Sequence, residues 1–127
     1  GQLGAVEYTT KPQVQLTIPA SKADFDVVKQ GLYQVVHGSN KYVTGKALAS
    51  VKPSVSGKTG TAETYYKSHS TTTLSFAGFA PSDNPQVVVA LVIPGASNSD
   101  GGANLTMAKQ IFEAYWKTVQ SPKGFGD

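Results

Sequence analysis

The sequence predicts an α+β fold, a three-stranded antiparallel meander with flanking helices. Three observations lead to this prediction. Apolar residues recur at helical spacing before residue 40 and again after residue 103. Between these segments, stretches rich in Thr, Tyr and Val alternate with turn-forming residues, as in consecutive antiparallel strands. The 127 residues, of which 39% are hydrophobic, suffice for one compact domain or for a piece of a larger one.

The first element is a helix that follows Ser21. Ser21 is a suitable N-cap residue, and Asp24 supplies the acidic half of a capping box. Gly38 is expected to end the helix as its C′ residue. A short second helix is expected at 44–48, and Pro53 closes it. The apolar face of the first helix consists of Phe25, Val28, Leu32, Val35 and Val36.

Three strands follow. Residues 55–66 are expected to form the first and residues 72–80 the second, joined by a polar connection at 67–70. A turn at 81–85 leads to a third strand at 86–93. This third segment is apolar without alternation, which predicts a strand buried on both faces in the middle of a sheet. Because only one strand neighbours it in the sequence, we expect that the sheet has further strands.

The last regular element is an amphipathic helix. Asn104 is expected to cap it, and residues 121–127 are expected to form a frayed tail. One face carries Leu105, Ala108, Ile111, Phe112, Tyr115, Trp116 and Val119.

Composition excludes several functions. The chain has no Cys, which excludes disulfides, zinc–thiolate sites and thiol catalysis. The 11 basic residues are all Lys and are scattered, so we expect no nucleic-acid partner. The loop at 94–102 has too few ligands for calcium, and we expect neither a metal nor a cofactor. The longest apolar run, 87–93, is too short to span a membrane.

The most informative stretch is 56–63, which reads Ser-Gly-Lys-Thr-Gly-Thr-Ala-Glu. Its Gly-Lys-Thr matches the end of a phosphate-binding P-loop, but that motif needs a Gly where Lys52 stands. A P-loop also needs a helix after the motif, and this sequel is strand-like. The P-loop interpretation therefore fails.

Alternation along a strand divides this stretch between two faces. Lys58 and Gly60 point one way, and Thr59 and Thr61 the other. A lysine on the inner face can place a positive charge beside a nucleophile from an adjacent helix. Gly60 lets that helix approach the backbone, and the Thr59 and Thr61 hydroxyls can bind a substrate carboxylate.

Several segments together resemble the class B penicillin-binding proteins. They are the K-T-G-T-A-E motif at 58–63, the flanking strands 75–81 and 87–93, the turn 83–85, and the upstream segments 28–36 and 44–47. The similarity covers about residues 13–119. It implies that residues 1–120 are the C-terminal half of a penicillin-binding-protein/β-lactamase-like transpeptidase domain. The five-stranded sheet of that domain would be completed by its N-terminal half.

The resemblance also implies roles for individual residues. Lys58 would be catalytic by placing charge and protons beside the nucleophile. Thr61 would be catalytic because its backbone N–H forms half of the oxyanion hole. Thr59, Gly60 and Thr61 would bind substrate. The activity implied is D,D-transpeptidation of peptidoglycan stem peptides through a serine acyl-enzyme that β-lactam antibiotics also form.

The nucleophile motif of the family, S-x-x-K, is absent from the sequence, because no Lys has Ser three residues before it. Thr64 and Thr106 occupy that place before Lys67 and Lys109. The S-x-N at 82–84 follows the K-T-G box instead of preceding it, and we interpret it as a turn. We therefore expect the chain to be inactive alone.

The expected partners are the N-terminal half that carries both missing motifs, the stem peptide and β-lactams. The parent protein would lie at the extracytoplasmic face of the bacterial cell membrane. Alternatives are a β-lactamase, a D,D-carboxypeptidase or a β-lactam sensor of the same superfamily, or a non-catalytic peptide-binding module. Glu63 and His69 are interpreted as surface residues and His37 as a structural one.

Overall fold

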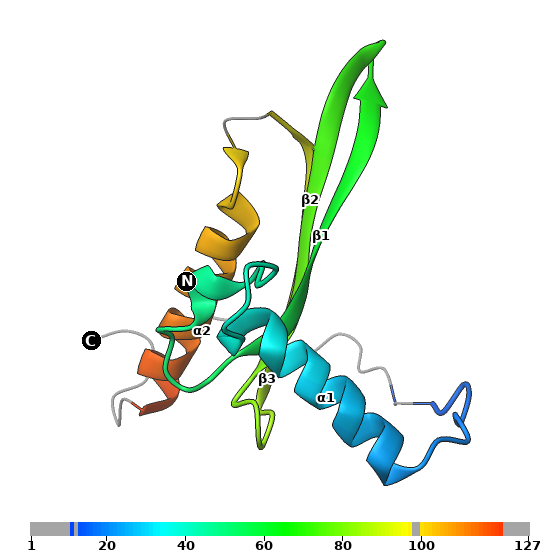
Figure 1. The fold of residues 1–127 in the computed structure, drawn as a ribbon, viewed down its shortest axis with the longest axis vertical. Helices are drawn as coiled ribbons and strands as arrows, with labels where there is room; N and C mark the ends of the chain where they lie inside the picture. Colours follow the sequence, from blue (N-terminus) through cyan, green and yellow to red (C-terminus); the bar gives the residue numbers. More distant parts are fainter. Residues whose placement is uncertain (1–10, 12, 98–99, 121–127) are drawn as a thin grey trace.

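The computed structural model describes residue 11, residues 13–97 and residues 100–120. The elements, in order, are α1 (Lys22–His37), the 3₁₀ helix η1 (Lys46–Leu48), β1 (Ser56–Tyr66), β2 (His69–Ala80), β3 (Val87–Ala96) and α2 (Ala103–Gln120) (Figure 1). Both strand pairs are antiparallel, and the sheet order is β1-β2-β3. The predicted α+β meander with flanking helices is therefore confirmed. The expected tail at 121–127 lies outside the described residues.

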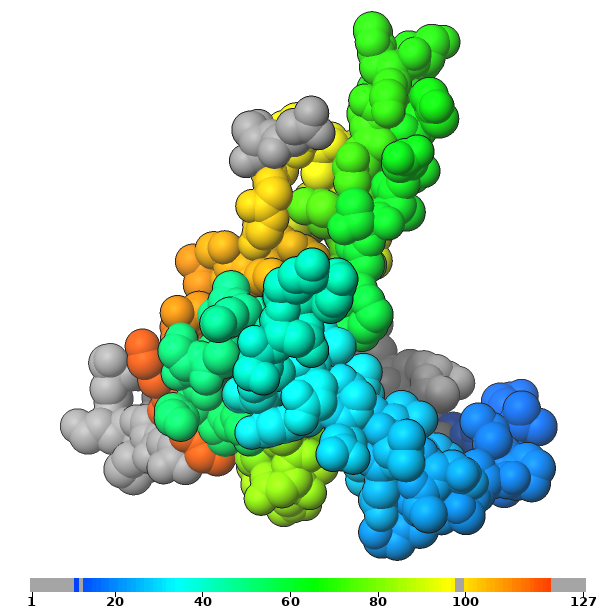
Figure 2. Space-filling view, in the orientation of Figure 1, coloured from blue at the N-terminus to red at the C-terminus, as the bar shows by residue number. Residues whose placement is uncertain are grey.

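The hairpin of β1 and β2 is longer than the sequence suggested. Its turn consists of Lys67 and Ser68 alone, with φ of 48° and 65°, so β2 begins at His69 and not near Thr72. Two residues with positive φ suit the twist of a tight hairpin. The tip stands clear of the rest of the molecule (Figures 1 and 2), which leaves Tyr65 and Tyr66 exposed.

One face of the sheet carries the hydrophobic core. Phe76 of β2 meets Phe112 of α2 edge to face, with ring centroids 6.4 Å apart. The Phe76 ring also lies over Gly57 and Gly78, where any side chain would collide with it. The other core residues come from α1, η1, the segment before β1, the strands β2 and β3, and α2; they are Val36, Leu48, Val51, Val55, Ala80, Val89 and Ala108.

The opposite face of the sheet is largely uncovered. Val88 and Val92 of β3 are 74% and 69% exposed, and Ala77 and Ala90 beside them are exposed as well. The prediction that 86–93 is a central strand buried on both faces is wrong for this chain. β3 is an edge strand, because β2 is its sole neighbour in the described sheet.

Helix α1 begins as predicted and packs only at its end. Ser21 and Asp24 form the capping box, and hydrogen bonds from the Ser21 hydroxyl and N–H lower the pKa of Asp24. Of the predicted apolar face, Val36 is buried, whereas Phe25 and Val28 are 48% and 59% exposed. Gly38 ends the helix in an extended conformation, with φ of −62° and ψ of 160°. It therefore does not adopt the left-handed conformation expected of a C′ glycine.

Helix α2 begins at Ala103, two residues earlier than a cap at Asn104 would give. Asn104 lies inside it and is not its cap: the buried side-chain amide donates to the carbonyl of Ser75 at 2.7 Å. This bond fixes the start of α2 against the middle of β2. No helix within the described ranges is both long and apolar enough to cross a bilayer.

Candidate functional site

The K-T-G segment lies in the first half of β1, and its side chains alternate between two faces as predicted. In this chain, however, the core side is the face of the threonines and not the face of Lys58, which was expected to be the inner one. Thr59 and Thr61 pair with Phe76 and Leu74 of β2 and so face the core side. Lys58 pairs with the exposed Ala77 and faces the uncovered side. Lys58 is itself exposed, and its Nζ donates to the carbonyl of Thr59 at 2.6 Å.

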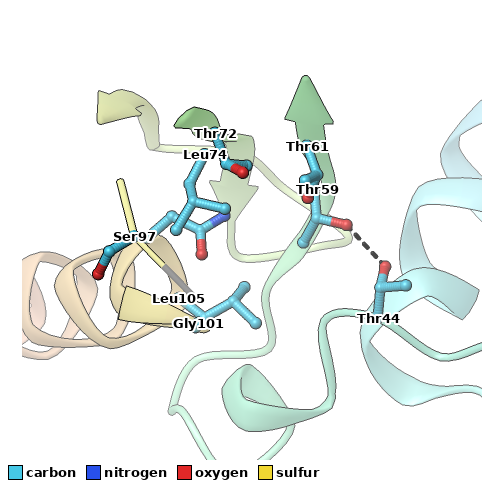
Figure 3. A pocket seen from close by; sticks show the side chains of 10 residues that line it. Thr44, Thr59, Thr61, Thr72, Leu74, Ser97, Gly101 and Leu105 are labelled. Carbon is cyan, nitrogen blue, oxygen red and sulfur yellow. Dashed lines mark hydrogen bonds between the residues drawn. The ribbon is translucent and has the colours of Figure 1, made fainter. Parts of the chain in front are cut away.

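Thr59 and Thr61 line a cavity of about 380 Å³ between the sheet and the start of α2 (Figure 3). β2 contributes Thr72 and Leu74 to its wall, and α2 contributes Asn104 and Leu105. The cavity is thus rich in hydroxyl groups on the side of the sheet. The first turn of α2 adds the positive end of the helix dipole. This combination favours a small anionic group.

Thr44 is a residue of this site that the sequence did not identify as functional. The sequence predicts only that Thr44 opens a short helix, but its hydroxyl lies 2.7 Å from that of Thr59 and also lines the cavity (Figure 3). The two residues are 15 positions apart. A threonine before a helix is common as a start signal, so only the folded chain reveals this contact.

Gly60 faces the uncovered side together with Lys58. A Cβ at this position would collide with the hydroxyl of Ser75, its partner on β2. The Ser75 hydroxyl thus occupies the place of a side chain at position 60, and another element can approach Gly60 on this face only as far as that hydroxyl.

The segment 82–84 is structural, as interpreted from the sequence. It lies in the turn between β2 and β3, where the Asn84 N–H donates to the Asp83 side chain at 3.0 Å. The Ser82 hydroxyl accepts from Ser56 at 2.8 Å. The Ser56–Ser82 contact lies at the start of β1, and none of these residues lines the cavity of Thr59 and Thr61.

The two histidines also match their interpretation. His37 shares a hydrogen bond of 3.0 Å with the Val55 carbonyl and stacks on Tyr33. His69 is exposed at the hairpin, as is Glu63 further along β1. Within the described residues, no three His, Asp or Glu side chains gather in a group that could hold a metal ion.

One carboxylate, that of Asp100, is hydrogen-bonded to a residue that lines the cavity. Asp100, in the loop before α2, accepts from the Ser97 N–H at 2.7 Å and from the Ser97 hydroxyl at 2.8 Å. These hydrogen bonds lower the pKa of Asp100. The Asp100 carboxylate therefore holds Ser97, a residue that lines the cavity.

Comparison with known proteins supports the resemblance seen in the sequence. The family model of the penicillin-binding protein transpeptidase domain matches residues 2–114. Penicillin-binding protein 2B of Streptococcus pneumoniae (strain R6) is 37% identical over 119 residues, which cover 92% of this chain and 18% of that protein. Peptidoglycan D,D-transpeptidase MrdA of Haemophilus influenzae is 30% identical over 106 residues, covering 73% and 16%.

The fold agrees with these matches. The structure of penicillin-binding protein 2B from Streptococcus pneumoniae (strain R6) superposes with a TM-score of 0.79 at 35% identity, covering 97% of this chain and 20% of that one. The chain thus spans about one fifth of the length of the relatives it matches. The family match over most of the sequence and the shared fold lead to one conclusion: the chain belongs to the transpeptidase domain family of the penicillin-binding proteins, and its resemblance to class B is confirmed.

Proposed function

We propose that this chain forms the K-T-G wall of a peptidoglycan D,D-transpeptidase whose nucleophilic serine lies on other polypeptide of the same domain. The serine hydroxyl attacks the carbonyl of the penultimate D-Ala of a stem peptide, and the terminal D-Ala leaves. The amine of a neighbouring stem then attacks the acyl-enzyme ester, forms the cross-link and frees the serine. A β-lactam acylates the same serine when its ring opens.

The observation that carries this proposal is the uncovered face of the sheet. It presents Lys58 of β1 on the same face as the exposed apolar residues Val88 and Val92 of β3, a surface that a folded protein normally buries. A helix that brings a serine and its own lysine would cover the apolar part and approach the Lys58 ammonium. The relatives are about five times longer than this chain and so have the polypeptide to supply such a helix.

Each residue of the segment then has a role. Lys58 provides positive charge and a proton donor beside the serine. Thr59 and Thr61 bind the substrate carboxylate with their hydroxyls, and the Thr61 backbone N–H donates to the oxyanion. Gly60 leaves room for the serine-bearing helix. A single oxyanion donor contributes about 3 to 4 kcal/mol to acyl transfer.

The proposed setting follows from the same relatives. One of them is named a peptidoglycan D,D-transpeptidase, and peptidoglycan is assembled outside the cytoplasm. We therefore place the parent protein at the extracytoplasmic face of the cell membrane, with the N-terminal half of the domain, the stem peptide and β-lactams as partners.

The test is acylation of the complete protein by a fluorescent penicillin. We expect the unsubstituted protein to be labelled and Lys58→Ala to lower the second-order acylation rate by about 100-fold or more, because a proton donor is lost. Lys117→Ala is the matched control, since Lys117 is an exposed lysine on α2. It should label at the original rate.

The opposite result is equally clear. A complete protein that binds stem peptides but is never labelled would be a non-catalytic peptide-binding module. Equal labelling of the Lys58→Ala and Lys117→Ala proteins would remove Lys58 from the mechanism.

A further inference from the structure

Thr44 lies outside the K-T-G strand and makes a direct contact with it. Its Oγ1 is 2.7 Å from the Oγ1 of Thr59, and Figure 3 shows the two side chains pointing toward each other from different parts of the chain. The contact therefore depends on the tertiary structure. It joins the segment before η1 to the strand that carries the proposed carboxylate-binding hydroxyls.

Backbone hydrogen bonds hold the segment around Thr44 in place. The Gly45 N–H donates to the Val35 carbonyl at 2.9 Å, and the Leu48 N–H donates to the Gly45 carbonyl at 2.9 Å. Gly45 is buried, and a Cβ there would lie 3.0 Å from the Val35 carbonyl oxygen. The glycine thus allows close packing on the end of α1, which fixes where Thr44 meets β1.

Proton counting gives this contact a direction when an anion binds. A carboxylate has acceptors only, so Thr59 can bind it only by donating its single hydroxyl proton. In the bond between the two threonines, Thr59 must then accept and Thr44 must donate. A hydroxyl that accepts one hydrogen bond is polarised and becomes a stronger donor in the next. The two hydrogen bonds therefore run in one direction: Thr44 donates to Thr59, and Thr59 donates to the carboxylate.

We infer that Thr44 is a positioning residue for carboxylate recognition: it donates to Thr59 and so directs the Thr59 proton into the cavity. The inference rests on the proposed function, because it takes Thr59 as a ligand of the substrate or β-lactam carboxylate. The valine variant of Thr44 keeps the shape of the side chain and loses the donor. The Thr59 hydroxyl is then free to rotate and to donate its proton to other acceptors.

The experiment compares benzylpenicillin with its methyl ester, which lacks the negative charge, on the complete protein. We expect Thr44→Val to lower the acylation rate with benzylpenicillin by about three- to tenfold, the effect of one hydrogen bond. The rate with the ester should not change. Thr44→Ser, which keeps the donor, should restore most of the rate with benzylpenicillin. Thermal melting of each variant reports whether it folds.

Two further variants sharpen the test. Thr71→Val is the matched control, because Thr71 forms a hydroxyl pair of 3.0 Å with Thr64 near the hairpin tip. It should acylate at the original rate. In a double-mutant cycle, Thr44→Val should have little effect in the presence of Thr59→Val, since both act through one proton.

Three outcomes would overturn the inference. They are equal losses with benzylpenicillin and its ester, full activity of Thr44→Val, and additive effects of Thr44→Val and Thr59→Val. A failure of the proposed function gives a different result, since the unsubstituted protein would then not be acylated at all.

Discussion

At the scale of single residues, the K-T-G strand separates charge from hydroxyl groups. Lys58 and Gly60 face the uncovered side of the sheet, whereas Thr59 and Thr61 face the cavity. Alternation alone predicted this division, because it follows from the pleat of any strand. The Thr44–Thr59 and Asn104–Ser75 bonds could not be predicted. Both bonds join residues that are distant in sequence. In the sequence, Thr44 and Asn104 look like ordinary residues at the start of a helix.

Gly60 offers a prediction that separates packing from catalysis. In Gly60→Ala the new methyl group meets the Ser75 hydroxyl, which must rotate at a cost of about 1 kcal/mol. Adding Ser75→Ala removes the hydroxyl, and the Cβ of residue 75 then lies 3.7 Å from the new methyl carbon, an ordinary van der Waals contact. The melting temperature of the complete protein should therefore fall in the single variant and recover in the double variant.

Acylation by fluorescent penicillin should follow a different pattern. It should stay low in both variants, because the methyl group still occupies the space that the serine-bearing helix needs. Recovery of acylation together with stability would show that Gly60 serves only the packing of Ser75.

At the scale of elements, two paired glycines leave room for an aromatic ring over β1 and β2. Gly57 and Gly78 are direct partners across the strands, and the Phe76 ring covers both. The sequence alone does not explain these glycines, since the reason is the Phe76 ring of β2, which lies over both of them in the folded sheet. By contrast, the α1 capping box was readable because its partners are three residues apart.

A pair of glycine substitutions tests this packing. Gly57→Ala places a Cβ 2.7 Å from the Phe76 ring and the Ala77 carbonyl, and should destabilise the complete protein by about 1 to 3 kcal/mol. Gly31→Ala is the matched control, because nothing lies within 4 Å of its added Cβ on helix α1. It should be stabilising by about 0.5 to 1 kcal/mol.

Chemical denaturation of both variants checks the prediction. A Gly57→Ala protein as stable as the original would contradict the packing of Phe76 on the glycine pair.

At the scale of the whole molecule, the chain has one covered and one uncovered sheet face. The apolar run in β3 predicted burial on both sides, and it was wrong for this chain because Val88 and Val92 are exposed. The run nevertheless fits the proposed larger protein. Hydrophobic patterning reflects every surface that a strand meets, including those supplied by polypeptide outside the described residues. The exposed apolar residues Phe25 and Val28 of α1 fit the same account.

The most direct test of the account is to locate the penicilloyl group on the complete protein after reaction with benzylpenicillin. Digestion and mass spectrometry should find the adduct on a serine of a peptide outside residues 1–127, within an S-x-x-K sequence, and should find residues 1–127 unmodified. A penicilloyl adduct on any residue of this chain would contradict the account.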